Sequence, residues 1–165
     1  MNLKPPRILT ALLALAIFLS ACTSEPADNE TEILGEINYQ AEVAWLENIR
    51  TDSEELLEYR EVLDLDRFVS QSEVPVVIIV RQENDYGASE VIPLVEEAAY
   101  TYGEDVHFVF AYHNTENDFL LYLDYESTPT FFLIHDHAVQ AQAGWEQEEG
   151  LIRLQKKLDE IIREG

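Results

Sequence analysis

Three short and almost continuous apolar runs constrain the fold of this chain more than any other feature. They occupy residues 75–80, 106–112 and 130–134. Runs of this length that are rich in valine, isoleucine and phenylalanine predict strands buried on both faces. Because such strands need helices on both sides of the sheet, the sequence predicts a layered α/β domain.

Helical and strand patterns fill the spaces between these runs. The sequence predicts a short strand over 61–65, a short helix over 66–71, a connection with helix over 119–123 that Asn114 and Thr115 open, a turn over 135–137 and a strand over 138–143. Two apolar stripes at helical spacing predict further helices, one at Val91, Leu94, Val95, Ala98 and Tyr102 and one at Leu151, Leu154, Leu158, Ile161 and Ile162. The expected order over 61–165 is therefore β-α-β-α-β-α-β-β-α.

The segment before this domain is also predicted to be helical. Val43, Leu46 and Ile49 would share one face of a helix, and Leu56 and Leu57 indicate a second short helix. We therefore expect a helical extension over residues 37–60, with the face beside Trp45 packed on the main domain.

The amino-terminal segment has the three parts of a signal peptide. Lys4 and Arg7 form a basic start, residues 8–19 are almost wholly apolar, and small residues lead into Cys22. The apolar run is short for a transmembrane helix, which needs about 20 residues. A buried hydrophobic start followed by a chance cysteine is the alternative interpretation.

The run from Leu19 to Cys22 resembles the lipobox of bacterial lipoproteins. The resemblance implies that residues 1–21 are removed, and that Cys22 is diacylated and anchors the exported chain to a bacterial membrane. Thr23 is compatible with the outer membrane if the cell is Gram-negative. Residues 22–36 are then the lipidated cysteine and a flexible acidic tether, and residues 61–165 form the main domain.

The charge of the chain is strongly negative. The mature chain would carry 8 Lys+Arg against 33 Asp+Glu, a formal charge of −25 that is spread along its length. Such a surface repels nucleic acid and anionic headgroups, so no nucleic-acid partner is expected. Adaptation to a salty or alkaline habitat is the favoured cause of the acidity, and calcium buffering is the alternative.

The sequence from Ser127 to Thr130, followed by four apolar residues, resembles the segment of thioredoxins that carries a cis-proline before a core strand. Pro93 resembles the proline inside the active-site helix of that family. Gly144, before the last helix, agrees with this match. The resemblance covers residues 62–162 and implies a thioredoxin-like three-layer sandwich with a central mixed sheet. An unrelated α/β domain is the alternative.

The departures from the thioredoxin pattern argue against its reaction. The positions that match the family's Cys-x-x-Cys motif hold Asp85 and Ala88, and the family's buried acid corresponds to Ile79. Cys22 is the only cysteine of the chain. Since thiol exchange needs an attacking thiolate, we expect no redox activity and no redox cofactor.

The resemblance leaves a binding groove as the candidate site. It would be formed by the loop at Thr128 and Pro129, with Tyr86 and Trp145 as aromatic walls and Asp85 as a carboxylate. Such loops offer main-chain groups to an extended peptide. In the alternative interpretation, the two aromatic residues merely cap the edge of the core.

The four histidines give weaker candidates. His135 and His137 fall short of the three or four ligands of a zinc site, so a solvated turn without metal is expected. His113 could pair with Asp85 as a general base, and His107 is a core candidate. A P-loop, a dinucleotide fingerprint and an EF-hand spacing do not occur, so no cofactor is predicted.

Three functions remain open from the sequence. The first is a lipid-anchored, non-redox module that binds or scaffolds a protein or peptide partner in the cell envelope. The second is a cysteine-free enzyme that uses Asp85 and His113. The third is an acidic calcium-binding or structural envelope protein.

Overall fold

The structure, a computed structural model, describes residues 32–50, 55–82, 87–113 and 117–165. Together these belong to one compact unit, residues 32–165. Its strands are β1 (Leu34–Ile37), β2 (Val43–Arg50), β3 (Glu55–Val62), β4 (Val76–Arg81), β5 (His107–Tyr112), β6 (Thr130–His135) and β7 (Ala138–Gly144). Its helices are α2 (Leu65–Gln71), α3 (Ala88–Tyr102), α4 (Asp118–Leu121) and α5 (Glu148–Glu164), with a 3-10 turn, η1 (Gly103–Asp105).

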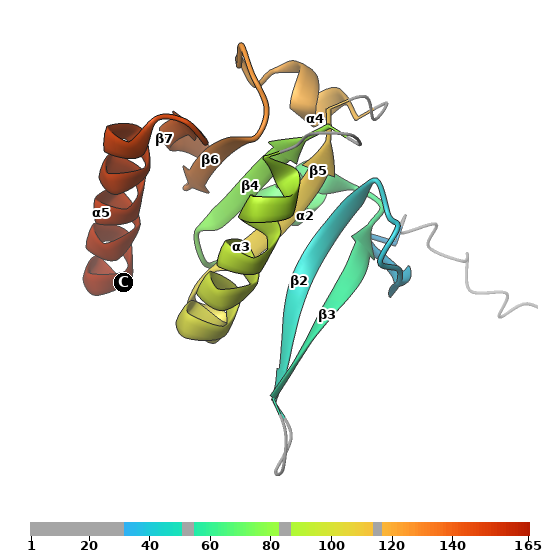
Figure 1. Cartoon of the computed structure of the whole chain (residues 1–165). Helices are drawn as coiled ribbons and strands as arrows, with labels where there is room; N and C mark the ends of the chain where they lie inside the picture. Colours follow the sequence, from blue (N-terminus) through green and yellow to red (C-terminus); the bar gives the residue numbers. More distant parts are fainter. Residues whose placement is uncertain (1–31, 51–54, 83–86, 114–116) are drawn as a thin grey trace, which may run out of the picture. The chain divides into compact units, whose positions relative to one another are not determined.

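A single mixed sheet forms the centre of this unit (Figure 1). The strand order is β1-β3-β2-β5-β4-β6-β7. Among the described strands, β4 and β5 form the only parallel pair, and the other neighbouring pairs are antiparallel. The fold is therefore an α/β architecture around a seven-stranded mixed sheet.

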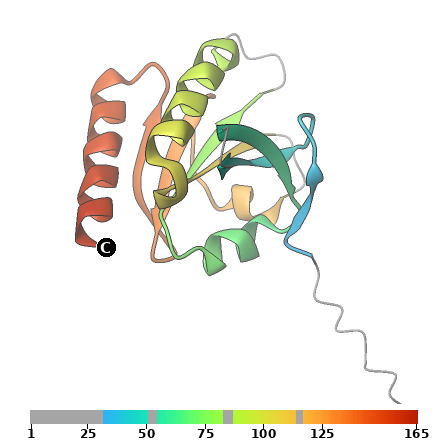
Figure 2. The same cartoon turned by 90° about the horizontal axis from the view of Figure 1, so that it is seen from below.

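Helices cover both faces of the sheet (Figure 2). One apolar cluster joins α3 and α5 to one face, through residues such as Val91, Val95, Leu154 and Leu158. A second cluster joins α2 and α4 to the other face. This two-sided cover explains why all six residues of β4 are buried. The prediction of buried strands flanked by helices is confirmed.

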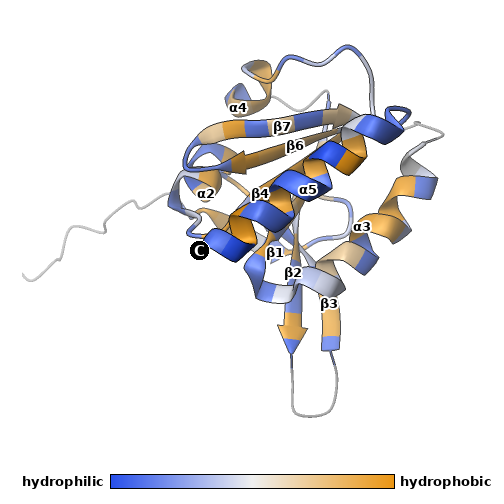
Figure 3. Ribbon diagram, turned by 90° about the vertical axis from the view of Figure 1, so that its left-hand side faces the viewer, coloured by the Kyte–Doolittle hydropathy of each residue, from blue (hydrophilic) through white to orange (hydrophobic). Residues whose placement is uncertain are grey.

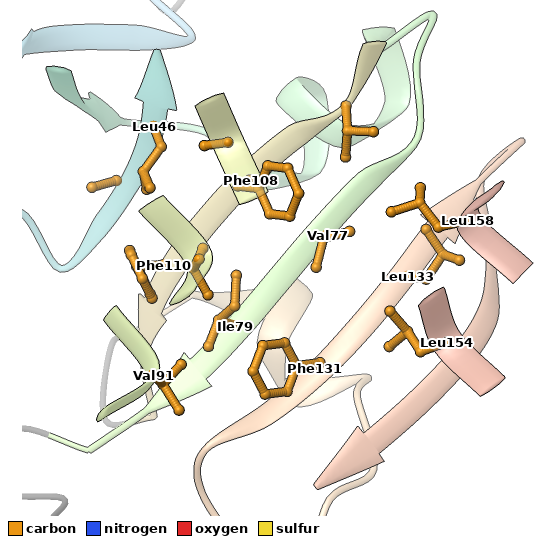
Figure 4. Packing of buried hydrophobic residues seen from close by; sticks show 14 of the residues in the cluster. Leu46, Val77, Ile79, Val91, Phe108, Phe110, Phe131, Leu133, Leu154 and Leu158 are labelled. Atoms are coloured by element: carbon orange, nitrogen blue, oxygen red, sulfur yellow. The ribbon is translucent and has the colours of Figure 1, made fainter. Parts of the chain in front are cut away.

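The core beneath α3 and α5 is built from alternate residues of the central strands (Figure 4). Val77 and Ile79 of β4 lie beside Phe131 and Leu133 of β6 because these residues face each other in the antiparallel register. Leu154 packs on this layer from α5. In Figure 3 the apolar residues of α5 form a stripe on a mostly hydrophilic helix, as an amphipathic surface helix requires.

The predicted helical extension over 37–60 is wrong. Residues 43–50 and 55–62 form strands β2 and β3, an antiparallel hairpin within the main sheet. Val43 and Leu46, which would share one face of a helix, lie in the clusters on opposite faces of the sheet. In a strand that is buried on both faces, apolar residues need not alternate. An apolar spacing of three residues therefore does not distinguish such a strand from a helix.

Smaller boundaries also differ from the sequence-based expectations. Strand β1 occupies part of the predicted tether over 22–36, and the predicted strand over 61–65 is divided between the end of β3 and the start of α2. Asp64 caps α2, where its side chain accepts a hydrogen bond from the Arg67 main-chain N–H at 3.0 Å. The expected order from the helix over 66–71 onward is confirmed.

We predict that Leu133→Ala lowers the free energy of unfolding by about 2–5 kcal/mol, because Leu133 is fully buried and its truncation leaves a cavity. The same substitution at Leu94, which is 51% exposed on α3, should change it by no more than about 0.5 kcal/mol. Denaturant unfolding of both variants measures the difference, and equal losses would contradict the described core.

Candidate functional site

Two hydrogen bonds hold the loop that precedes β6. The Thr128–Pro129 peptide bond is cis. The Thr130 hydroxyl donates a hydrogen bond to the carbonyl of Ser127 at 2.5 Å, and the main-chain N–H of Trp145 donates to the carbonyl of Pro129 at 2.9 Å. The first bond closes the loop on itself, and the second joins the loop to the turn that follows β7.

A cleft of about 340 Å³ lies between this loop, the first turn of α3 and the turn after β7. Its lining consists of Gly87, Glu90, Ser127, Thr128, Pro129, Trp145 and Glu146. The structure thus brings together three of the predicted groove residues, namely Thr128, Pro129 and Trp145. The Trp145 ring also packs at a tilt on Phe131, with 6.3 Å between the ring centroids, so it serves both the core edge and the cleft.

The cleft offers main-chain groups and an aromatic wall. Within the described part of the chain, neither main-chain group of Thr128 has a hydrogen-bond partner. The ionisable side chains that line the cleft, Glu90 and Glu146, are both acidic. This arrangement suits an extended chain that pairs with the loop and carries neutral or cationic side chains.

A second cleft of about 350 Å³ adjoins the first at Ser127. It is lined by polar residues, among them Asp124, Glu126 and Gln142. The Gln142 amide donates a hydrogen bond to the carbonyl of Asp124 at 2.7 Å, which ties the start of the loop to β7. The loop therefore borders two recesses that meet at Ser127, and both are open to a bound segment.

Several predicted site residues lie outside the described residues. These are Cys22, with the whole signal peptide, and Asp85 and Tyr86. Ala88 is the first residue of α3. The second aromatic wall at Tyr86 and the pair of Asp85 with His113 therefore remain predictions. His113 itself is exposed, and its Nδ1 lies 2.8 Å from the Tyr125 hydroxyl.

Two other histidines, His107 and His137, lie away from the cleft. His107 packs against Trp45 and Phe68, and its Nδ1 lies 3.1 Å from the Ser72 hydroxyl. His137 lies in the turn between β6 and β7 with a positive φ of 59°. Within the described ranges, no three His, Cys, Asp or Glu side chains come together as a metal site.

The sequence analysis missed the acidic side of the cleft. Glu90 comes from α3 and Glu146 from the turn after β7, and no local pattern singles out either among 33 acidic residues. It also missed Arg81, the buried cation at the end of β4. The one signal for Arg81 in the sequence is its position directly after the apolar run 75–80.

The chain matches no protein-family model and no curated protein among those compared. No helix in the described part of the chain is long and apolar enough to cross a membrane. The interpretation of the site therefore depends on its geometry.

We predict that His107 makes the stability of the domain decrease with acidity. Burial lowers the pKa of His107 from its ordinary value of 6.5, so below pH 6.5 the unfolded chain binds this proton more readily than the folded one. The resulting loss in the free energy of unfolding grows as the pH falls from 6.5 to the pKa of His107 in the folded chain, and it stays constant below that pKa. Thermal unfolding between pH 7.5 and 5 should show a weaker pH dependence in His107→Gln than in the unmodified chain, and an equal dependence in the two would contradict the prediction.

Proposed function

We propose that this chain is an exported, lipid-anchored protein whose thioredoxin-like domain binds an extended segment of a protein partner in the cell envelope. The observation that carries the proposal is the cleft at the Thr128–Pro129 loop, where unpaired main-chain groups lie beside the Trp145 ring. Paired main-chain groups supply affinity in this mode of recognition, and adjacent pockets supply specificity.

Three features support the thioredoxin-like interpretation of the fold. The element order from α2 to α5 agrees with the order that the resemblance implies. Pro93 lies inside α3, which follows the central strand β4. Pro129 directly precedes strand β6, and its loop lies beside the first turn of α3.

The single cysteine and the apolar residue at position 79 favour a binding role without redox chemistry. Cys22 is the only cysteine of the chain, and lipidation would remove its thiol. Ile79 is fully buried in the apolar cluster beneath α3 and supplies no proton-transfer group. The tether after Cys22 would hold the cleft near the membrane, where a partner of the envelope can reach it.

We predict that a photo-reactive phenylalanine analogue in place of Ser127 cross-links a discrete partner in the native cells. Ser127 is exposed and lines both clefts, so a bound segment would lie within reach of the probe. The same analogue at exposed Gln155 on α5 serves as the positional control. Mass spectrometry identifies the partner and the linked peptide.

A charge reversal tests whether the cleft itself binds the partner. Glu90→Lys places a cation in the lining and should reduce the Ser127 cross-link, whereas Glu97→Lys, two turns further along the same exposed side of α3, should preserve it. Both variants leave the buried core untouched. An identical set of products from positions 127 and 155, or a cross-link that Glu90→Lys leaves unchanged, contradicts the proposal.

A further inference from the structure

Arg81 is a charged residue in an otherwise apolar layer. It is the last residue of β4 and only 9% exposed. Side chains alternate along a strand, and Val77 and Ile79 belong to the cluster beneath α3. Arg81 therefore lies on the face of the sheet that α3 covers.

Two aromatic rings of the neighbouring strand hold the Arg81 guanidinium. Its central carbon lies 4.8 Å from the centroid of the Phe110 ring and 4.6 Å from that of the Tyr112 ring. The Tyr59 ring stacks on the Phe110 ring, with 6.1 Å between the two ring centroids. These contacts stabilise the cation and restrict its orientation, but they leave its hydrogen-bond donors unused.

The Arg81 guanidinium has no acceptor in the described part of the chain. Its Nε is buried without a hydrogen-bond partner, and no carboxylate there forms an ion pair with it. The Glu96 carboxylate of α3 forms no ion pair with Arg81 and accepts a hydrogen bond from the Tyr59 hydroxyl at 2.6 Å. A buried cation that has no counter-charge among the described residues is strongly destabilising, so an anion that reaches it gains a strong interaction.

The position of Arg81 is one where α/β proteins bind ligands. Arg81 and Tyr112 face each other at the carboxyl ends of the parallel strands β4 and β5. Chain direction reverses next to this pair, because β6 runs antiparallel to β4 on its other side. Ligands of open α/β sheets bind in the crevice outside the carboxyl ends of the parallel strands. In Figure 1 the start of α3 lies near this end of β4.

We propose that Arg81 anchors a binding site for the carboxylate group of a small monoanionic ligand, distinct from the partner-binding cleft. A guanidinium donates two parallel hydrogen bonds to a planar carboxylate. The elements around it, α3, β4 and β5, contain no other lysine or arginine, so the site supplies one positive charge. A phosphate dianion would keep an uncompensated charge beside a strongly acidic surface, which favours the monoanion.

Acetate is the probe for this site, titrated against chloride at constant ionic strength with the intact chain. The arginine Nε–H signal of Arg81 in a ¹H–¹⁵N spectrum should shift saturably with acetate. Arg81→Lys keeps a positive charge but loses the planar fork, so its affinity for acetate, followed by thermal shift, should weaken by about tenfold or more. Arg153→Gln, at an exposed position of α5, is the matched control and should bind acetate as the unmodified chain does.

Three outcomes overturn the inference. The first is an Arg81 signal that does not move or that moves linearly without saturation. The second is an equal acetate response in Arg81→Lys and in the unmodified chain. The third is tighter saturation by inorganic phosphate than by acetate, which would replace the carboxylate site with a general oxyanion site. The readout on unmodified Arg81 does not depend on how any variant folds, and it is independent of partner capture at Ser127.

Discussion

The parallel pairing of β4 with β5 is the constraint on which the rest of this structure depends. A parallel pair needs a crossover connection, and α3 supplies it on one face of the sheet. Strand β4 is buried on both faces, so α2 and α4 must cover the other side. The end of β4, the start of β6 and the start of α3 are therefore brought toward one end of the sheet.

Both proposed sites lie at this end of the sheet. On the β6 side, the loop at Pro129 and the first turn of α3 form walls of the cleft. On the β5 side, Arg81 lies against Phe110 and Tyr112. The two sites differ in charge, because the cleft is lined by carboxylates and the second site by a single guanidinium. The two proposed sites therefore favour ligand groups of opposite charge.

The sequence predicted the candidate site in part. Thr128, Pro129 and Trp145 were identified from the resemblance, because a proline directly before an apolar run and a tryptophan after the last strand are local signals. Glu90 and Glu146 could not be found in this way, since acidic residues are everywhere in the chain and only the approach of α3 to the turn after β7 selects these two. The burial of the Arg81 Nε without a partner among the described residues is likewise a property of the packed structure.

The sequence by itself determined the buried strands β4, β5 and β6, the amphipathic helix α5 and the presence of a single cysteine, because each follows from a local apolar run, a local spacing or a residue count. Only the tertiary structure decided that residues 43–50 form a strand. The spacing of Val43 and Leu46 fits both a helix and a strand covered on two faces. Pairing of Trp45 with Val109, far along the chain, makes the strand the state in which main-chain hydrogen bonds and apolar burial are both satisfied.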